Sequence, residues 1–330
     1  MAKKIVVAGV TSLYVAVGVG GFPLRYRPTS RPAWLASGVT GAGGHIAKVL
    51  RRLGDDVRLC TVVGRDPAGA AIRADLDAAG LLGPAVVEGP ASTMGLVLVT
   101  PEGRRMGYPH LRPLDRATYP RGLFRRQARG ADLLVLTNTR FVRDLLPEVR
   151  DLGVPIAVDV HLVSDLEDPY NLPWLEAATV VFCSHEKLPC PPAAWVARVF
   201  QRYPRCRLVG VGRGTRGLLL GVRDGRLIRV NAIAPRGVIN TSGAGDALFA
   251  AFLHGWLATG DPVSAAEDAV LIAGWKIGDV FPGSGSLSDH ELSALRATHG
   301  VRSSLTRWKE PPHPAGEGPS CRTAPDELSA

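Results

Sequence analysis

The chain has 330 residues, enough for one large α/β unit or, at roughly 150 residues each, about two domains. Apolar residues make up 46% and charged residues 21%, a composition that supports a sizeable core and excludes wholesale disorder. The net charge of +9 comes from basic residues scattered singly or in pairs, without like-charge runs or interleaved aromatics. We therefore expect no nucleic-acid partner, and mild positive charge suits an anionic small ligand better.

The first uncharged stretch, residues 5–24, is long enough to imitate a signal peptide or a membrane span. Glycines, Thr11 and Ser12 interrupt it between two β-branched runs, which is typical of two strands joined by a turn. The five cysteines are an odd number without a C-x-x-C pair, so neither a disulfide framework nor structural zinc is expected. Together these features predict a cytoplasmic protein with no membrane contact.

From residue 5 to about 280, short Val/Ile/Leu runs alternate with stretches of helical length, which predicts βαβ units around a mostly parallel sheet. The predicted strands are 5–10, 57–64, 131–137, 154–160, 178–183 and 207–212. The predicted helices are 44–53, 67–79, 141–152, 193–203, 245–258 and 263–277.

Two segments, residues 13–37 and 93–108, break this alternation, and we expect them to add a small sheet over the ligand site. The domain is predicted to span residues 1–300. Five prolines and no periodic apolar face predict a disordered tail over residues 301–330.

The most informative stretch is residues 238–255, VINTSGAGDALFAAFLHG. Gly243, Ala244 and Gly245 let a ligand approach the backbone closely, and an apolar periodicity then indicates a helix. A glycine-rich turn that opens a helix presents unpaired N–H groups and the positive end of the helix dipole, which favours phosphate. Asp246 begins this helix, where it either accepts a proton from an attacking hydroxyl or only caps the helix.

This stretch resembles the C-terminal motif D-T-x-G-A-G-D of the PfkB, or ribokinase-like, carbohydrate and nucleoside kinases. Weaker similarities follow the family's order along the chain: residues 45–54, 57–80, 158–162 and 211–220 resemble its N-x-A helix, its G-x-D-x-x-G segment, its D-x-N-x-R stretch and its nucleotide loop. The resemblance implies a three-layer α/β/α fold with a mostly parallel central sheet and a small β lid.

The resemblance also implies transfer of the γ-phosphoryl group of ATP, with Mg²⁺ bound to the nucleotide, to a hydroxyl of a small-molecule acceptor. Asp246 would be the base, and the Gly243–Gly245 turn would be the anion hole. Residues implied to contact the nucleotide are Thr241, Gly212, Gly214, Arg216 and Gly217, although a solvated surface charge is the competing interpretation of Arg216.

Several positions depart from the family pattern. The first aspartate of the motif is Asn240, and the N-x-x-E pair that organises magnesium becomes Ser184 and Lys187, which leaves Glu186 as a displaced metal candidate. On the acceptor side we expect Tyr14, Gly41 and His45 to contact the substrate. Tyr14 stands where the family has an aspartate and His45 where it has an asparagine, so simple sugar-hydroxyl recognition is altered.

Three functions follow from these residues. The first is a kinase for a sugar or sugar-like alcohol. The second is a nucleoside kinase of the same family, which Tyr14 favours. The third is a nucleotide-responsive binding or regulatory protein with weakened catalysis, which Ser184 and Lys187 favour and Asp246 opposes. The oligomeric state stays open, with a homodimer as one option.

Overall fold

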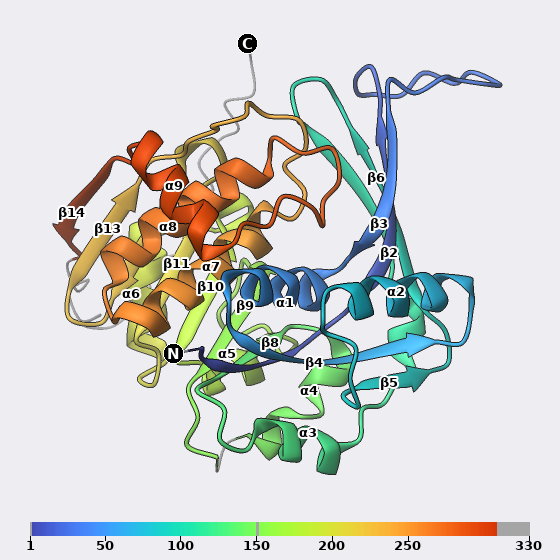
Figure 1. Ribbon diagram of the computed structural model, residues 1–330. Helices are drawn as coiled ribbons and strands as arrows, with labels where there is room; N and C mark the ends of the chain where they lie inside the picture. Colours follow the sequence, from blue (N-terminus) through green and yellow to red (C-terminus); the bar gives the residue numbers. More distant parts are fainter. Residues whose placement is uncertain (1, 150–151, 309–330) are drawn as a thin grey trace.

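The computed structural model describes residues 2–149 and 152–308. Within them, ten strands form one sheet and four strands form a second, smaller sheet (Figure 1). The large sheet has the order β14-β13-β12-β11-β10-β9-β8-β1-β4-β5. It comprises β1 (Lys4–Ala8), β4 (Asp56–Gly64), β5 (Val86–Gly89), β8 (Leu133–Thr137), β9 (Ile156–Leu162), β10 (Val180–Ser184), β11 (Leu208–Gly212), β12 (Leu218–Val222), β13 (Arg226–Val230) and β14 (Ser303–Arg307).

Seven neighbouring strands of this sheet run parallel: β5, β4, β1, β8, β9, β10 and β11. Strands β12, β13 and β14 then extend the sheet through antiparallel pairs. Along β1, Ile5 and Val7 face one hydrophobic cluster, whereas Val6 and Ala8 face the other. This alternation buries both faces of the sheet between helices, as expected of a parallel sheet. The predicted mostly parallel central sheet is confirmed.

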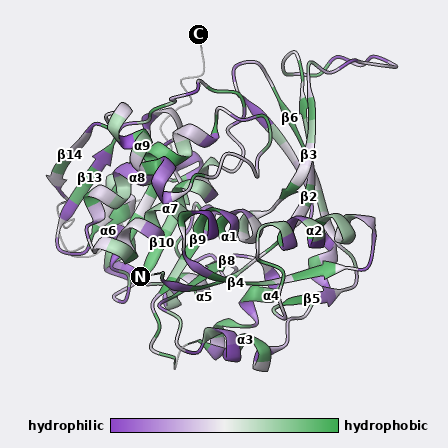
Figure 2. Cartoon of the chain, in the orientation of Figure 1, coloured by the Kyte–Doolittle hydropathy of each residue, from purple (hydrophilic) through white to green (hydrophobic). Residues whose placement is uncertain are grey.

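Helices cover both faces, so the unit has three layers. The first cluster packs beneath α1 (Ala42–Leu53), α2 (Pro67–Ala78), α7 (Ala244–Thr259), α8 (Pro262–Lys276) and α9 (Asp289–Thr298). The second lies under α3 (Arg121–Ala128), α4 (Arg140–Arg143), α5 (Leu172–Ala177) and α6 (Pro192–Arg202). In Figure 2, β4 is coloured largely as hydrophobic, whereas α3 carries hydrophilic residues.

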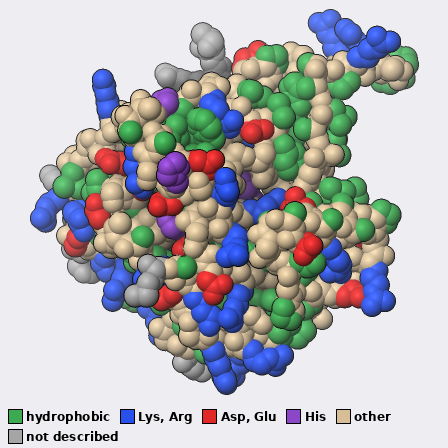
Figure 3. All heavy atoms as spheres, in the orientation of Figure 1, with side chains coloured by type: hydrophobic (Ala, Val, Ile, Leu, Met, Phe, Trp, Pro, Cys, Tyr) green, Lys and Arg blue, Asp and Glu red, His purple; other side chains and the backbone are tan. Residues whose placement is uncertain are grey.

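The small sheet has the order β3-β2-β6-β7 and comprises β2 (Ser12–Gly18), β3 (Leu35–Thr40), β6 (Thr93–Val99) and β7 (Arg105–His110). It forms where residues 13–37 and 93–108 were expected to add strands. Residues 19–34 between β2 and β3 project from it, and Tyr26 in this arm is 91% exposed. Figure 3 shows hydrophobic side chains gathered over the small sheet and basic side chains near the tip of the arm.

Local chemistry explains several helix starts. Asp66 caps α2 by accepting from the backbone N–H of Gly69. Asp261 caps α8 by accepting from the N–H groups of Val263 and Ser264. Ser288 and Glu291 form a capping box at α9. Each cap satisfies donors that a helix start leaves unpaired.

Two predictions about elements differ from the structure. The predicted helix 141–152 is instead α4 followed by a 3₁₀ turn, Leu146–Glu148, because Pro147 cannot donate to a continuing helix. The predicted tail of residues 301–330 begins too early, because β14 pairs with β13 through backbone hydrogen bonds. Residues 309–330 lie outside the described part of the chain. No helix in residues 2–149 and 152–308 is both long and apolar enough to cross a membrane.

Candidate active site

The turn before α7 has a backbone that only glycine adopts easily. Gly243 has φ of 79°, in the left-handed region, and is the N-cap of α7. A Cβ atom there would lie 2.6 Å from the carbonyl oxygen of Pro282 and 2.8 Å from Nδ1 of His45. The N–H of Ala244 donates to the carbonyl of Thr241 at 3.3 Å, whereas the next N–H groups open the helix and have no partner within its first turn. The turn therefore leaves backbone N–H donors free at the start of a helix, an arrangement that favours anions.

Asp246 lies in the first turn of α7, with its side chain 17% exposed. Oδ2 of Asp246 lies 3.8 Å from Nδ1 of His45. Burial alone would raise the pKa of Asp246, but His45, His161 and Arg105 lower it below the usual aspartate value. Asp246 is therefore a carboxylate at neutral pH, in the form that can accept a proton.

His45 lies on α1 and is fully buried between Gly243 and Asp246. Neither ring nitrogen has a hydrogen-bond partner among the described residues. Burial lowers the pKa of His45, and this outweighs the raising effect of Asp246. A neutral imidazole with no hydrogen-bond partner for either nitrogen thus lies buried beside Asp246, which is unusual for a buried polar group. The structure sets this side chain against the turn and Asp246.

Asp159 and His161, both on β9, meet Asp246. One ligand atom from each of the three side chains lies within 4.8 Å of the others. His161 has φ of 54°, and its backbone N–H donates to Oδ1 of Asp159. Burial raises the pKa of Asp159, and the charge of Asp246 adds to this, against the opposing effect of His161. The two carboxyl groups are thus shifted in opposite directions.

Of this cluster, Asp246 was predicted from the sequence, whereas Asp159 and His161 were not among the predicted site residues. The only signal for them was the match of residues 158–162 to the D-x-N-x-R stretch, in which His161 takes the place of the asparagine. Two carboxylates and one imidazole offer the oxygen and nitrogen ligands that divalent cations use, although magnesium prefers an all-oxygen set. Asp159 is therefore the buried carboxylate beside Asp246 that fits a magnesium ion.

The predicted acceptor residues reach the site from the small sheet and from the start of α1. Tyr14 lies on β2, and its ring covers Gly95 so closely that a Cβ atom there would be 2.1 Å from Cζ. Burial and the charge of Asp246 raise the pKa of Tyr14. Gly41, with φ of 90°, caps α1 and accepts from the backbone N–H of His45. Tyr14 and His45 are thus both electrostatically linked to Asp246.

The predicted nucleotide loop follows β11. Gly212 ends this strand, Gly214 and Gly217 have φ of 55° and 81°, and the segment Gly214–Arg216 forms a 3₁₀ turn. A Cβ atom at Gly212 would lie 3.9 Å from Leu248 of α7, so the loop starts beside the helix that carries Asp246. Arg216 is exposed, and its carbonyl accepts from Arg213.

The metal candidate from sequence, Glu186, lies in the 3₁₀ turn His185–Lys187 after β10. Its side chain is exposed, and its backbone N–H donates to Oγ of Ser184. Glu186 is not part of the Asp159, His161 and Asp246 cluster. Its role as a metal ligand stays a prediction.

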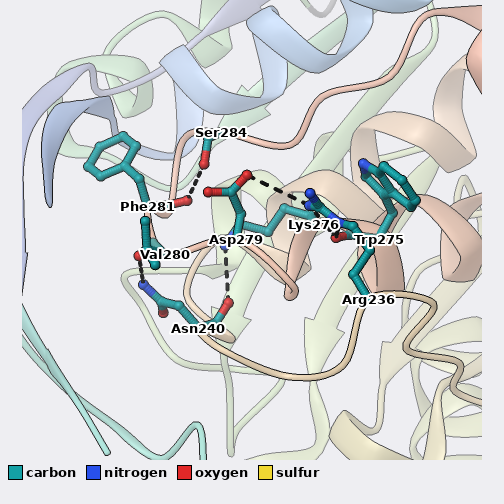
Figure 4. Close-up of polar contacts among 8 residues, drawn as sticks. All are labelled: Arg236, Asn240, Trp275, Lys276, Asp279, Val280, Phe281 and Ser284. Carbon is teal, nitrogen blue, oxygen red and sulfur yellow. Dashed lines mark hydrogen bonds and ion pairs between the residues drawn. The ribbon is translucent and has the colours of Figure 1, made fainter. Parts of the chain in front are cut away.

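The turn before α7 is also tied to two other segments. Oγ1 of Thr241 donates to the carbonyl of Gly103, in the turn between β6 and β7. Behind the turn, Asn240 is fully buried, and its side chain donates to the carbonyl of Val280 (Figure 4). The side chain of Asn240 also accepts from the N–H of Ser242. Asn240 therefore replaces the family's aspartate with an amide that uses both its donor and its acceptor.

The second half of the chain is similar to a known family of kinases. Residues 176–287 match the model of the pfkB family carbohydrate kinases. This part of the chain is similar to that family. The chain is 29% identical over 255 residues to an acarbose 7(IV)-phosphotransferase of Actinoplanes sp., covering 76% of this chain and 84% of that protein. It is 28% identical over 236 residues to an ATP-dependent ribose-1-phosphate kinase of Halopiger xanaduensis, covering 69% and 77%.

Solved structures of small-molecule kinases share the fold. A microbiome-derived acarbose kinase, Mak1, superposes with a TM-score of 0.79 at 24% identity, over 90% of this chain and 100% of that one. A nucleoside kinase of Burkholderia thailandensis, in complex with inosine, superposes with a TM-score of 0.71 at 18% identity. The match covers 91% of this chain and 99% of that one. The predicted resemblance to the PfkB family and the predicted ribokinase-like α/β/α fold are confirmed, and the matched relatives are named as a phosphotransferase and a kinase.

Proposed function

We propose that this kinase transfers the γ-phosphoryl group of ATP to a hydroxyl of a sugar or sugar-like acceptor, with Asp246 as base and the Gly243–Gly245 turn as anion hole. The observation that carries the proposal is the position of Asp246. Its carboxylate stands in the first turn of α7, beside a glycine-rich helix start, with a neutral His45 at 3.8 Å. We also propose that the protein acts in the cytoplasm, where ATP is available.

In this reaction the acceptor oxygen attacks the γ-phosphorus while the bond to the β,γ-bridging oxygen breaks and ADP leaves. The hydroxyl proton passes to Asp246. The N–H groups of Gly243, Ala244 and Gly245 face the migrating phosphoryl group, and because they are fixed in the turn they need little reorganisation. Because the N–H of Ala244 also donates to the carbonyl of Thr241, the N–H groups of Gly243 and Gly245 would contribute most of the hydrogen bonding to the phosphoryl group.

The nucleotide is proposed to lie between this turn and the loop at Gly212, Gly214 and Gly217, with Thr241 and Arg216 beside it. Magnesium would be held by Asp159 together with the nucleotide phosphates, and Glu186 is the second candidate ligand. When bound, the ion neutralises phosphate charge during transfer. Asp159 fits this role because its carboxylate is buried on β9, within 4.8 Å of the ligand atoms of His161 and Asp246.

The acceptor would lie against Tyr14, His45 and Gly41. A tyrosine ring can pack against the apolar face of a sugar or cyclitol ring, and His45 offers two unpaired nitrogens to its hydroxyls. The similarity to the acarbose 7(IV)-phosphotransferase makes acarbose the first acceptor to test. The second candidate function is a nucleoside kinase, which Tyr14 favours because an aromatic ring also stacks on a base.

The test is an ADP-release assay with ATP and magnesium over acarbose, ribose-1-phosphate, ribose, fructose, inosine and adenosine, with mass spectrometry of each product. We expect acceptor-dependent ADP release and a phosphorylated sugar-like product. Phosphorylation of the nucleosides alone would support the second function. Nucleotide binding without transfer to any acceptor would instead support the weakened binding protein that Ser184 and Lys187 suggest.

A further inference from the structure

Lys276, the last residue of α8, is 1% exposed and is among the largest fully buried side chains of the described residues. Its Nζ donates to the carbonyl of Asn240 at 3.2 Å (Figure 4). The described part of the chain gives Lys276 no carboxylate within ion-pair distance. A buried ammonium without a close counter-ion is costly for folding, so its presence calls for a functional explanation.

The carbonyl that Lys276 binds belongs to the segment that leads into the anion hole. The backbone N–H of Asn240 donates to Ile277 at 3.0 Å, and its side chain donates to Val280 at 2.8 Å. Oδ1 of Asn240 accepts from Ser242, one residue before Gly243. The end of α8 and the chain after it therefore support the turn from behind. Of the four hydrogen bonds that Asn240 makes here, only the one from Lys276 has a charged donor.

We propose that Lys276 is a positioning residue of the anion hole, whose buried ammonium fixes the Asn240 carbonyl and adds positive charge behind the turn that receives the γ-phosphoryl group. This inference rests on the proposed function. Negative charge on the transferring group is stabilised best by charges and dipoles that are already fixed and shielded from water. Lys276 meets both conditions because it is buried and hydrogen-bonded to the turn.

The proposal has a consequence for pH. Burial lowers the pKa of Lys276 to about 8, while Asp279 and Asp246 raise it and Arg105 and Arg236 lower it further. The group therefore loses its charge as pH rises through about 8. Because its pKa in the unfolded chain is higher, the unfolded state binds more protons above this pH, and the lysine destabilises the fold less there. As pH rises through about 8, turnover should therefore fall, while Lys276 should lower the free energy of unfolding less than it does at neutral pH.

The experiment compares Lys276→Met, Lys276→Gln and the control Lys48→Met with the native enzyme. Lys48 is a partly buried lysine that also donates to a carbonyl, that of Val39, and pairs with Asp75. Turnover is measured from pH 6 to about 9.5, spanning the lowered and ordinary lysine values. Affinities for ADP and for a non-hydrolysable ATP analogue, together with melting temperatures, are measured at pH 7.

We expect both Lys276 variants to lose about tenfold or more in turnover and in affinity for the ATP analogue, with ADP affinity and melting temperature not lowered. The native alkaline decline near pH 8 should be absent from both, and Lys48→Met should behave like the native enzyme. Glutamine can still donate to Asn240, so full activity in Lys276→Gln would overturn the role of charge.

Equal losses of affinity for ADP and for the ATP analogue, together with a lower melting temperature, would show that Lys276 has only a structural role. That result would also overturn the proposal. The nucleotide affinities need no acceptor. A native enzyme that phosphorylates none of the acceptors would therefore refute the proposed function, while the ADP and analogue comparison would still decide the role of Lys276.

Discussion

Gly243→Ala tests whether the geometry of the turn before α7 is required for both folding and phosphoryl transfer. Alanine at φ of 79° costs about 1–2 kcal/mol for the left-handed backbone alone. The added Cβ would also meet the Pro282 carbonyl at 2.6 Å, and relief of such overpacking costs about 1–3 kcal/mol more. We therefore expect the free energy of unfolding to fall by about 2–5 kcal/mol, with loss of turnover.

Two matched variants on the same helix separate these contributions. Gly260, at the other end of α7, has φ of 70° and no atom within 4 Å of an added Cβ, so Gly260→Ala measures the backbone cost alone. Gly245 has ordinary helical φ and equally open space, so Gly245→Ala should not destabilise the protein. Its methyl group would nevertheless stand at the helix start, and turnover should fall.

The assays are urea unfolding and ATP-dependent turnover on all three variants. If Gly243→Ala destabilises the protein no more than Gly260→Ala, the close contact with Pro282 does not matter. If Gly245→Ala also keeps native turnover, the turn is not the anion hole.

Three further predictions concern the acceptor and the metal. Tyr14→Phe should change acceptor KM little because the ring is retained, and loss of activity on sugars in a steady-state assay would show that the phenol itself binds the acceptor. His45→Ala should raise acceptor KM without changing ATP affinity measured by calorimetry, and an equal loss of both would show that the imidazole only supports the turn at Gly243. Asp159→Asn should raise the magnesium concentration needed for half-maximal turnover more than Glu186→Gln does, because Asp159 is buried at the site. The reverse order in a magnesium titration would make Glu186 the main ligand.

The parts of the fold and site that were predictable are those encoded locally. The strands β1, β4 and β8–β11 follow from short apolar runs, and the turn at Gly243 with Asp246 follows from glycines placed directly before a helical periodicity. The helix predicted at 141–152 was wrong because Pro147 interrupts a segment whose apolar spacing is otherwise helical. Strand β12 overlaps the segment interpreted as a nucleotide loop, β14 lies in the segment predicted to be a tail, and β13 was not predicted.

Contacts between distant segments could not be predicted, because no local pattern encodes which segments pair. His45 was expected from family position to contact substrate, but its packing against Gly243 and Asp246 depends on how α1 lies beside α7. The burial of Lys276 depends in the same way on the approach of the end of α8 to Asn240. A lysine in the last turn of a helix is usually exposed to solvent, where its positive charge interacts favourably with the negative end of the helix dipole.

The most direct test of the mechanism is Asp246→Asn, with Asp261→Asn as the matched control. Both exchanges replace a carboxylate with an amide at the start of a helix, but Asp261 caps α8 through Val263 and Ser264. For Asp246→Asn we expect turnover to fall by about 10² to 10⁴-fold, the usual effect of a general base, while nucleotide affinity is not weakened. Asp261→Asn should keep native turnover. Native turnover in Asp246→Asn would contradict the account, because Asp246 would then only cap α7.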